Sequence, residues 1–300
     1  MVDLNTENTQ AARRVLVIHN PTAGWRRRRR FERFLSALVD QGVDVHVRPT
    51  TKHGDAEAFA RDANPDDVDV IAVAGGDGTI NEVINGLTHS TIPLAIMPLG
   101  TANVFAHEIG LSVMPMDVAK TIAHGTPKPI SLGVVNGRRF VMMAGFGFDA
   151  YVVSQVNPKI KRLFGKGAYV ISTLCALLKF NFSKYRIWVD GQQYDVASAV
   201  IANGHFYGGT FVCAPDARLN DPSLHVVLFL NPGVARTIRY AMWLGMGRLH
   251  RLPDVKIIPA TNVIVEDVAD DPVQGDGDIL AHLPARISLV PASLAVLMPN

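Results

Sequence analysis

The sequence predicts an α/β fold, with a parallel-sheet domain up to about residue 130 and a mainly antiparallel β domain after it. Two observations indicate this division. The first part alternates short apolar runs with amphipathic stretches, as βαβ units do, whereas the second part consists of short strands with frequent turns. A chain of 300 residues with 48% hydrophobic residues is long and apolar enough for two domains.

The first strand and helix follow from apolar spacing. Residues 15–19 form a short apolar run that ends in the turn-forming sequence Asn-Pro-Thr-Ala-Gly. The segment 29–42 then places Phe and Leu residues three and four positions apart and closes on Gly42, which predicts a helix. The same reasoning gives the rest of this domain: a strand at 43–48, a helix at 55–63, a strand at 68–74, a helix at 80–87, a strand at 94–97, and a loop at 98–103 that opens a helix.

The second domain is expected to consist of short strands interrupted by helical stretches. Alternating or β-rich runs predict strands at 140–144, 185–189, 198–202, 225–230, 263–266 and 286–290. Helices are expected near 166–178 and 234–244. The boundary near 130 is a change of periodicity, because no low-complexity linker separates the two parts.

Composition excludes several classes of protein. With 29 Lys and Arg against 27 Asp and Glu the chain is nearly neutral, so charge alone identifies no partner. Cys175 and Cys213 show no metal-binding spacing, which argues against a zinc site or a disulfide scaffold. The N-terminus has no apolar signal segment, and the apolar stretch 168–178 is shorter than the roughly 20 residues that span a bilayer. We expect a cytoplasmic protein that does not span a membrane. Any contact with a membrane would be peripheral, at its inner face.

The stretch AVAGGDGTINEVINGL, residues 72–87, indicates a phosphate site at a strand–turn–helix junction. No lysine follows the glycines, so neither the P-loop pattern nor the dinucleotide pattern GxGxxG fits. Gly75 and Gly76 permit close approach of a ligand, and Thr79 offers a hydroxyl. A bare carboxylate would repel phosphate, so we expect Asp77 to hold Mg²⁺; the alternative is that Asp77 caps the helix.

Three further loops leave predicted strands of this domain, at 20–24, 50–56 and 98–103. Loops at the carboxyl ends of strands in an open parallel sheet share one crevice, the usual ligand site. Together the loops therefore predict a single phosphate-ligand site.

The motifs NPTAG, TKHGDA, GGDGTINEVINGL, PLGTANVFA and GFGFDA resemble the diacylglycerol kinase catalytic family, especially its stand-alone bacterial lipid kinases. GGDGT alone is shared with NAD kinases, whereas PLGTAN and GFGFDA distinguish the diacylglycerol kinase family from NAD kinases. The resemblance implies a nucleotide-binding α/β domain at 1–130 and a β-sandwich lipid-substrate domain at 131–285, with ATP between them. It also implies that a final segment, about 286–300, returns to the first domain.

The resemblance further implies the nucleotide-binding residues. Asn20, Pro21, Gly24 and Thr51 would surround the nucleotide, Gly75, Gly76, Asp77, Gly78 and Thr79 would hold the phosphates, and Thr101 and Asn103 would form the far wall. Glu82 either orients a site residue or lies in a solvated first turn.

A second cluster, Gln-Gly-Asp-Gly-Asp-Ile at 274–279, resembles the family's DGE motif, whose last carboxylate is the general base. Asp276 and Gly277 match the motif, and Asp278 stands where the family has glutamate. The resemblance thus makes Asp278 the catalytic base, acting with Asp77. From residue types alone, the same string is an ordinary hairpin turn.

The segment 219–224 is similar to the family's structural Mg²⁺ loop, LDDGxL. Asp221 is retained, whereas Asn220 and Pro222 replace the first Asp and the Gly. Arg218 and Ser223 could still supply backbone carbonyl oxygens to a metal ion.

The basic run at 26–30 could meet anionic headgroups, help to neutralise ATP, bind nucleic acid or form a solvated face. The basic cluster at 159–166 could likewise meet anionic headgroups or form a solvated face. With the resemblance, the sequence indicates an ATP-dependent, Mg²⁺-requiring lipid kinase that acts at a membrane surface, with diacylglycerol as the default acceptor. No nucleic acid partner is expected, and the oligomeric state, a homodimer included, is left open. The alternatives are a NAD kinase-like enzyme and a non-catalytic nucleotide- or lipid-binding protein.

Overall fold

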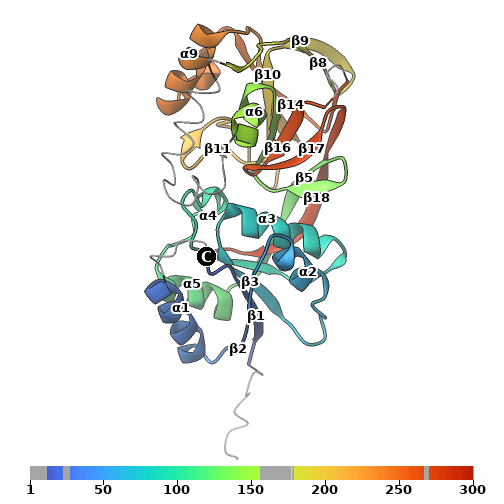
Figure 1. Ribbon diagram of the computed structural model, residues 1–300. Helices are drawn as coiled ribbons and strands as arrows, with labels where there is room; N and C mark the ends of the chain where they lie inside the picture. Colours follow the sequence, from blue (N-terminus) through green and yellow to red (C-terminus); the bar gives the residue numbers. More distant parts are fainter. Residues whose placement is uncertain (1–11, 23–27, 156–176, 178, 267–269, 300) are drawn as a thin grey trace, which may run out of the picture.

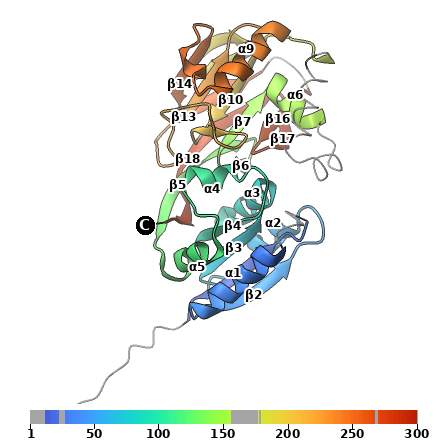
Figure 2. The same cartoon turned by 90° about the vertical axis from the view of Figure 1, so that its left-hand side faces the viewer.

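The structure, a computed structural model, describes residues 12–22, 28–155, 177, 179–266 and 270–299. It has two parts at opposite ends, an α/β part and a β-rich part (Figures 1 and 2). The α/β part contains, in chain order, β1 (Arg14–His19), α1 (Arg28–Asp40), β2 (Asp44–Pro49), α2 (Asp55–Arg61), β3 (Val70–Gly75), α3 (Asp77–Gly86), the 3-10 helix η2 (Leu87–His89), β4 (Leu94–Pro98), α4 (Val104–Glu108) and α5 (Pro115–His124).

The core of the α/β part is a parallel sheet in the order β2-β1-β3-β4. Its central strand β3 is buried along its whole length, because helices cover both faces. Helices α1 and α5 pack together on one face and α2 and α3 on the other (Figure 1). The strands and helices expected up to residue 108 are confirmed, with shifts at their ends, whereas α5 was not expected.

The β-rich part contains β5 (Pro127–Val135), β6 (Arg138–Phe140), β7 (Met143–Phe146), α6 (Phe148–Gln155), β8 (Tyr185–Val189), β9 (Gln192–Val196), β10 (Ser198–Ala202), β11 (Phe206–Tyr207), β12 (Phe211–Val212), β13 (Leu224–Phe229), α9 (Val234–Gly245), the 3-10 helix η3 (Leu249–Arg251), β14 (Val255–Ala260), β15 (Asn262–Val265), β16 (Pro272–Gly275), β17 (Asp278–His282) and β18 (Ala285–Leu297). Two sheets face each other across an apolar core, to which Phe146, Tyr185, Leu228, Val263 and Ile287 contribute. This is the expected β-sandwich.

The long strand β18 joins the two parts. It pairs antiparallel with β15 and β5, and near its end Val296 pairs in parallel with Leu94 of β4. One sheet therefore runs from β2 of the α/β part to β9 of the β-rich part. The expected strand at 286–290 is correspondingly only part of β18, and the limits drawn for the domains stay predictions.

One expected strand is wrong. Residues 140–144 do not form a continuous strand, because the chain bends at Val141 and Met142 between β6 and β7. The backbone N–H groups there donate to the carboxylate of Asp276 instead of to a neighbouring strand. The expected helix at 166–178 lies outside the described residues except for Leu177.

Candidate functional site

The loops that leave β1, β3 and β4 meet around the N-terminus of α3. The strands run parallel, so their carboxyl ends lie at one edge of the sheet. Asn20, directly after β1, donates from Nδ2 to Thr79 Oγ1 over 3.0 Å. Gly76 has extended backbone angles and precedes α3, whose first residue is Asp77. The amino end of a helix thus lies among the residues expected to bind phosphate.

Glu82 holds the loop after β2 against α3. Its Oε2 accepts hydrogen bonds from the backbone N–H groups of Gly54 (3.0 Å) and Ala56 (3.2 Å), and Oε1 lies 2.7 Å from His53 Nδ1. Its side chain is only 15% exposed, which favours the orienting role over the solvated turn. In the same loop, Thr51 donates through its N–H and its hydroxyl to the carboxylate of Asp55.

The glycine turns after β3 and β4 are in backbone contact. A Cβ added to Gly100 would lie 2.6 Å from Gly76 Cα, so neither turn has room for a side chain there. Asn103 has a left-handed φ of 48° and donates from Nδ2 to the carbonyl of Gly100. Its Oδ1 is buried and has no hydrogen-bond partner in the described part of the chain. A buried acceptor without a donor is costly, and beside residues expected to bind phosphate it is suited to a cation or a ligand N–H.

Replacing Gly100 by alanine should therefore destabilise the protein. The new methyl group would force the two turns apart, at a cost of about 1–3 kcal/mol in free energy of unfolding. Chemical denaturation measures this change. Gly245→Ala is the matched control, because an added Cβ there meets nothing within 4 Å, and its stability should stay at the wild-type value or rise slightly. Equal stability of the two variants would contradict the contact.

The carboxylate of Asp77 lies between the two glycine turns. Its Oδ1 accepts the backbone N–H of Val104 over 2.8 Å, so Asp77 caps the neighbouring helix α4 and not its own helix. Burial raises the pKa of Asp77, and hydrogen bonds from backbone N–H groups at 103–105 oppose that rise. A cation beside this carboxylate would offset the cost of burying its charge.

The hairpin between β16 and β17 brings Asp278 to the same place. Asp276 and Gly277 form its turn with φ angles of 52° and 89°, as an Asp-Gly turn of type I′ requires, so the hairpin-turn interpretation is confirmed. Asp278 is the first residue of β17. A Cβ added to Gly78 would lie 2.8 Å from Asp278 Oδ2, which places this carboxylate directly against the GGDGT turn. The structure thus brings Asp77 and Asp278 to one turn from the two parts of the molecule.

This contact predicts a selective defect for Gly78→Ala. Alanine favours the helix by up to about 1 kcal/mol, so thermal stability should be unchanged or higher. The methyl group would displace the Asp278 carboxylate, and if this carboxylate has the role that the motif resemblance implies, a displacement of about 1 Å can lower turnover roughly 100-fold. Steady-state turnover and thermal melting, measured on one preparation, test both parts. Full activity in a stable variant would contradict the assigned position of Asp278.

Asp276 connects the hairpin to α3. Its oxygens accept N–H groups of Val141, Met142 and Met143 at 2.8–3.1 Å, and Asn81 Nδ2 donates to it over 2.9 Å. Burial raises the pKa of Asp276, and these hydrogen bonds oppose the rise. The network fixes the hairpin, and with it Asp278, relative to the helix that begins at the glycine turn.

A second buried network extends from the GFGFDA motif. Asp149, at the start of α6, accepts hydrogen bonds from Tyr207 and, over 2.7 Å, from Gln274 Nε2. Gln274 Oε1 in turn accepts the N–H of Gly277 over 3.0 Å. Sequence reasoning missed Asn81, Gln274 and Tyr207 as supports of the site. Asn81 lies next to Ile80 on the apolar side of α3, and this position was the signal that could have pointed to a buried partner.

The predicted structural metal loop is closed by its own hydrogen bonds. Asp221 Oδ2 accepts the N–H of Arg218 over 3.0 Å, and the carbonyl of Arg218 accepts the N–H of Asp221 over 3.0 Å. His225 Nε2 lies 3.5 Å from the same carboxylate, and Ser223 is half-buried. Across the described ranges, no group of three or more His, Cys, Asp or Glu side chains is arranged to hold a metal ion.

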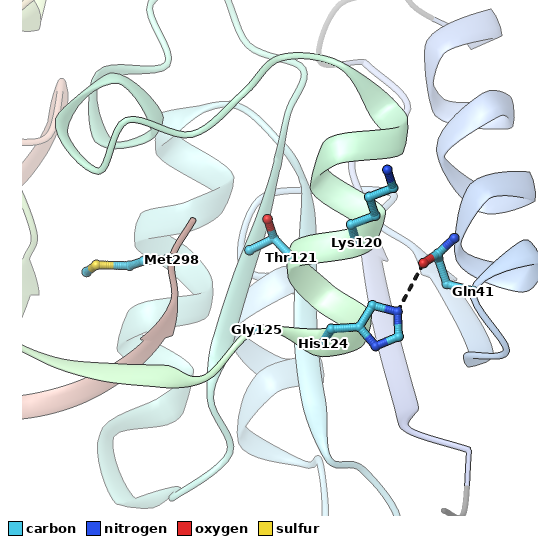
Figure 3. A pocket seen from close by; sticks show the side chains of 6 residues that line it. All are labelled: Gln41, Lys120, Thr121, His124, Gly125 and Met298. Atoms are coloured by element: carbon cyan, nitrogen blue, oxygen red, sulfur yellow. Dashed lines mark hydrogen bonds between the residues drawn. The ribbon is translucent and has the colours of Figure 1, made fainter. Parts of the chain in front are cut away.

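The remaining predicted site residues and the surface pockets add little to this geometry. Pro21 and Thr101 are exposed, and Gly24 lies outside the described residues, as do Trp25 to Arg27 and the cluster at 159–166. Figure 3 shows a pocket of about 300 Å³ at the ends of α1 and α5, lined by Gln41, Lys120, Thr121, His124, Gly125 and Met298. No residue of the glycine turns lines it, so it is separate from the candidate site.

Comparisons with known proteins agree with this geometry. Residues 14–135 match the family model of the diacylglycerol kinase catalytic domain, and residues 142–298 match that of the YegS C-terminal NAD kinase beta sandwich-like domain. The chain is 29% identical to a diacylglycerol kinase of Bacillus subtilis over 96% of its own length and 97% of the relative's. It is 31% identical to a diacylglycerol kinase of Mycobacterium tuberculosis, over 89% and 88% of the two chains.

Solved structures show the same relationship. A crystal structure of a diacylglycerol kinase from Bacillus anthracis superposes with a TM-score of 0.76 and 25% identity, covering 96% of this chain and 97% of that one. A second structure from that organism reaches a TM-score of 0.81 with 26% identity over 99% of both chains.

Proposed function

Since the chain belongs to the diacylglycerol kinase catalytic-domain family, we propose that it is an ATP-dependent lipid kinase, which transfers the γ-phosphate of Mg-ATP to a lipid hydroxyl. Diacylglycerol is the default acceptor, because two of the relatives described above are named diacylglycerol kinase. The observation that carries the proposal is the position of Asp278, a carboxylate from the β-sandwich held against the glycine turn of the α/β part.

The glycine turns would bind the phosphates of ATP. Backbone N–H groups at Gly76 and at the first turn of α3 are free of intrahelical partners by geometry, and the helix dipole favours an anion there. Asn20 and Thr51, with Gly24 as expected from the sequence, would flank the nucleotide. Glu82 keeps the Thr51 loop in place through Gly54 and Ala56.

Mg²⁺ fits the oxygen atoms beside the turns. The Asp77 carboxylate and the orphaned Oδ1 of Asn103 are oxygen ligands of the kind this ion takes, and Mg²⁺ is usually held by one or two carboxylates together with substrate phosphates. When bound, Mg²⁺ would neutralise negative charge on the phosphates. We also propose, as a weaker second site, that Arg218, Asp221 and Ser223 can hold a structural ion if their turn opens.

Asp278 would act as the general base. As the lipid hydroxyl attacks, its oxygen forms a bond to the γ-phosphorus, the bond from that phosphorus to the ADP oxygen breaks, and Asp278 accepts the hydroxyl proton. Asp276, Gln274 and Asn81 position the hairpin without touching the reacting atoms. The kinase would work at the inner face of the membrane as a peripheral cytoplasmic enzyme. None of the described helices has the length and apolar character needed to cross a bilayer.

Label transfer from γ-labelled ATP to a panel of lipids in mixed micelles tests the proposed function. We expect a labelled lipid, strongest with diacylglycerol, and no labelled NAD in a parallel reaction. Label on NAD and on no lipid would replace the proposal with NAD kinase activity. ATP binding without label on any acceptor would indicate a non-catalytic binding protein.

A further inference from the structure

Helix α9 of the β-sandwich presents an apolar stripe to solvent. Val234, Ile238, Met242 and Met246 are 40%, 43%, 57% and 56% exposed. They are spaced four residues apart, so they lie on one face of the helix and its C-terminal cap. The opposite face is anchored, because Tyr240 is buried and Trp243 and Leu244 pack against the core. Single exposed apolar side chains are ordinary, whereas a contiguous stripe indicates an interaction surface.

Neighbouring segments enlarge this apolar surface. Phe211 of β12, a strand in contact with α9, is 49% exposed. Met114 and Met116, at the start of α5, are 60% and 43% exposed. Helices α9, α4 and α5 lie on one side of the molecule, which faces the viewer in Figure 2. Exposed apolar residues of both parts thus belong to elements on that side of the molecule.

The charged residues of α9 are all positive. The helix contains Arg236 and Arg239 and no acidic residue, and Arg248 and Arg251 follow it. Asp254 is buried, and its Oδ2 lies 3.4 Å from Nη1 of Arg236 while its Oδ1 lies 3.7 Å from Nη1 of Arg239. Asp254 therefore pairs with two of the four arginines, and the exposed Arg248 and Arg251 leave a net positive charge next to the apolar stripe.

We propose that α9 is a membrane-docking helix, whose apolar stripe enters the lipid interface while Arg248 and Arg251, which follow it, contact anionic headgroups. An amphipathic helix with an exposed apolar face and basic residues near it is suited to this position. A second copy of the chain fits less well, because two-fold packing of α9 on α9 would bring the arginines of both copies together. The inference rests on the proposed function in one respect, that the acceptor lies in a bilayer.

Vesicle sedimentation tests the docking surface without relying on catalysis. The probe is vesicles of equal parts phosphatidylglycerol and phosphatidylcholine. The double variant Ile238→Gln/Met242→Gln should bind them roughly tenfold or more weakly than wild type, because two side chains no longer favour the interface. The matched control is Val39→Gln, which alters a side chain that is 63% exposed at the end of α1 and should bind as wild type does.

A second variant separates charge from apolar contact. Arg248→Gln/Arg251→Gln should lose affinity for the anionic vesicles and lose much less for phosphatidylcholine alone. Since these side chains lie outside the core, equal melting temperatures of all variants are expected. Wild-type binding by Ile238→Gln/Met242→Gln would overturn the proposal, as would a change from dimer to monomer in that variant with vesicle binding intact.

Failure of the docking proposal can be distinguished from failure of the proposed kinase function. On a short-chain diacylglycerol kept below its micelle concentration, the α9 variants should retain wild-type turnover while losing turnover on vesicles. If the wild type bound vesicles through α9 but phosphorylated no lipid, the docking surface would stand and the kinase proposal would fail. If it phosphorylated the short-chain acceptor and the α9 variants bound vesicles normally, the reverse would hold.

Discussion

Asp278→Asn is expected to lower turnover about 100- to 10,000-fold, the range over which a positioned general base accelerates proton transfer. The amide keeps the size of the side chain but cannot accept the proton of the lipid hydroxyl. Asp278 begins a strand whose hairpin is fixed by Asp276 and Gln274, so the fold and ATP binding should be retained. Single-turnover label transfer at saturating ATP measures the loss.

Asp278→Glu is the matched control for the base. It keeps a carboxylate and restores the glutamate that the resemblance to the DGE motif implies, so it should lose much less activity than Asp278→Asn. The extra methylene moves the carboxylate along the glycine turn, so a partial loss is expected. If both variants turned over at the wild-type rate, Asp278 would not be the base.

Asp77→Asn should lower turnover by about 100-fold or more and raise the Mg²⁺ concentration needed for half-maximal rate. The amide oxygen can still accept the N–H of Val104, so the α4 cap is kept while the charge is lost. Loss of charge beside the phosphates removes electrostatic stabilisation of the transferring group. A magnesium titration of the initial rate measures both effects.

Comparison of Asp77→Ala with Asp77→Asn separates the two proposed roles of this residue. It removes the charge and the cap together, so in addition to the catalytic loss it should cost about 1 kcal/mol of stability. Full turnover of Asp77→Asn at limiting Mg²⁺ would show that Asp77 serves only as a cap.

The α/β part was largely predictable from the sequence, because its strands are short apolar runs that end at glycine or proline turns. Strand β3 and the turn at Gly75 and Gly76 are the clearest case. Helix α5 was missed because its buried positions Val118, Ala119 and Ile122 give only a short apolar pattern. Strand β9, Gln192–Val196, was missed because it is mostly exposed and polar, with little alternation to read.

The rest of the site depends on contacts between distant segments. The bend at Val141 exists because Asp276, 135 residues later in the chain, accepts its N–H, and no local pattern carries that information. The contact between Gly76 and Gly100 and the position of Asp278 over Gly78 are likewise tertiary. Motif resemblance identified these residues, but only the packing of the hairpin on α3 shows which turn Asp278 faces.

The central claim is that phosphoryl transfer occurs where the β16–β17 hairpin meets the glycine turn of α3. A crystal structure with Mg²⁺ and a non-hydrolysable ATP analogue tests it most directly. The account predicts phosphate oxygens within hydrogen-bond distance of the backbone at Gly76 to Thr79, with the terminal phosphate toward Asp278. A nucleotide bound elsewhere, for example in the pocket lined by Lys120 and His124, with the glycine turn empty, would contradict it.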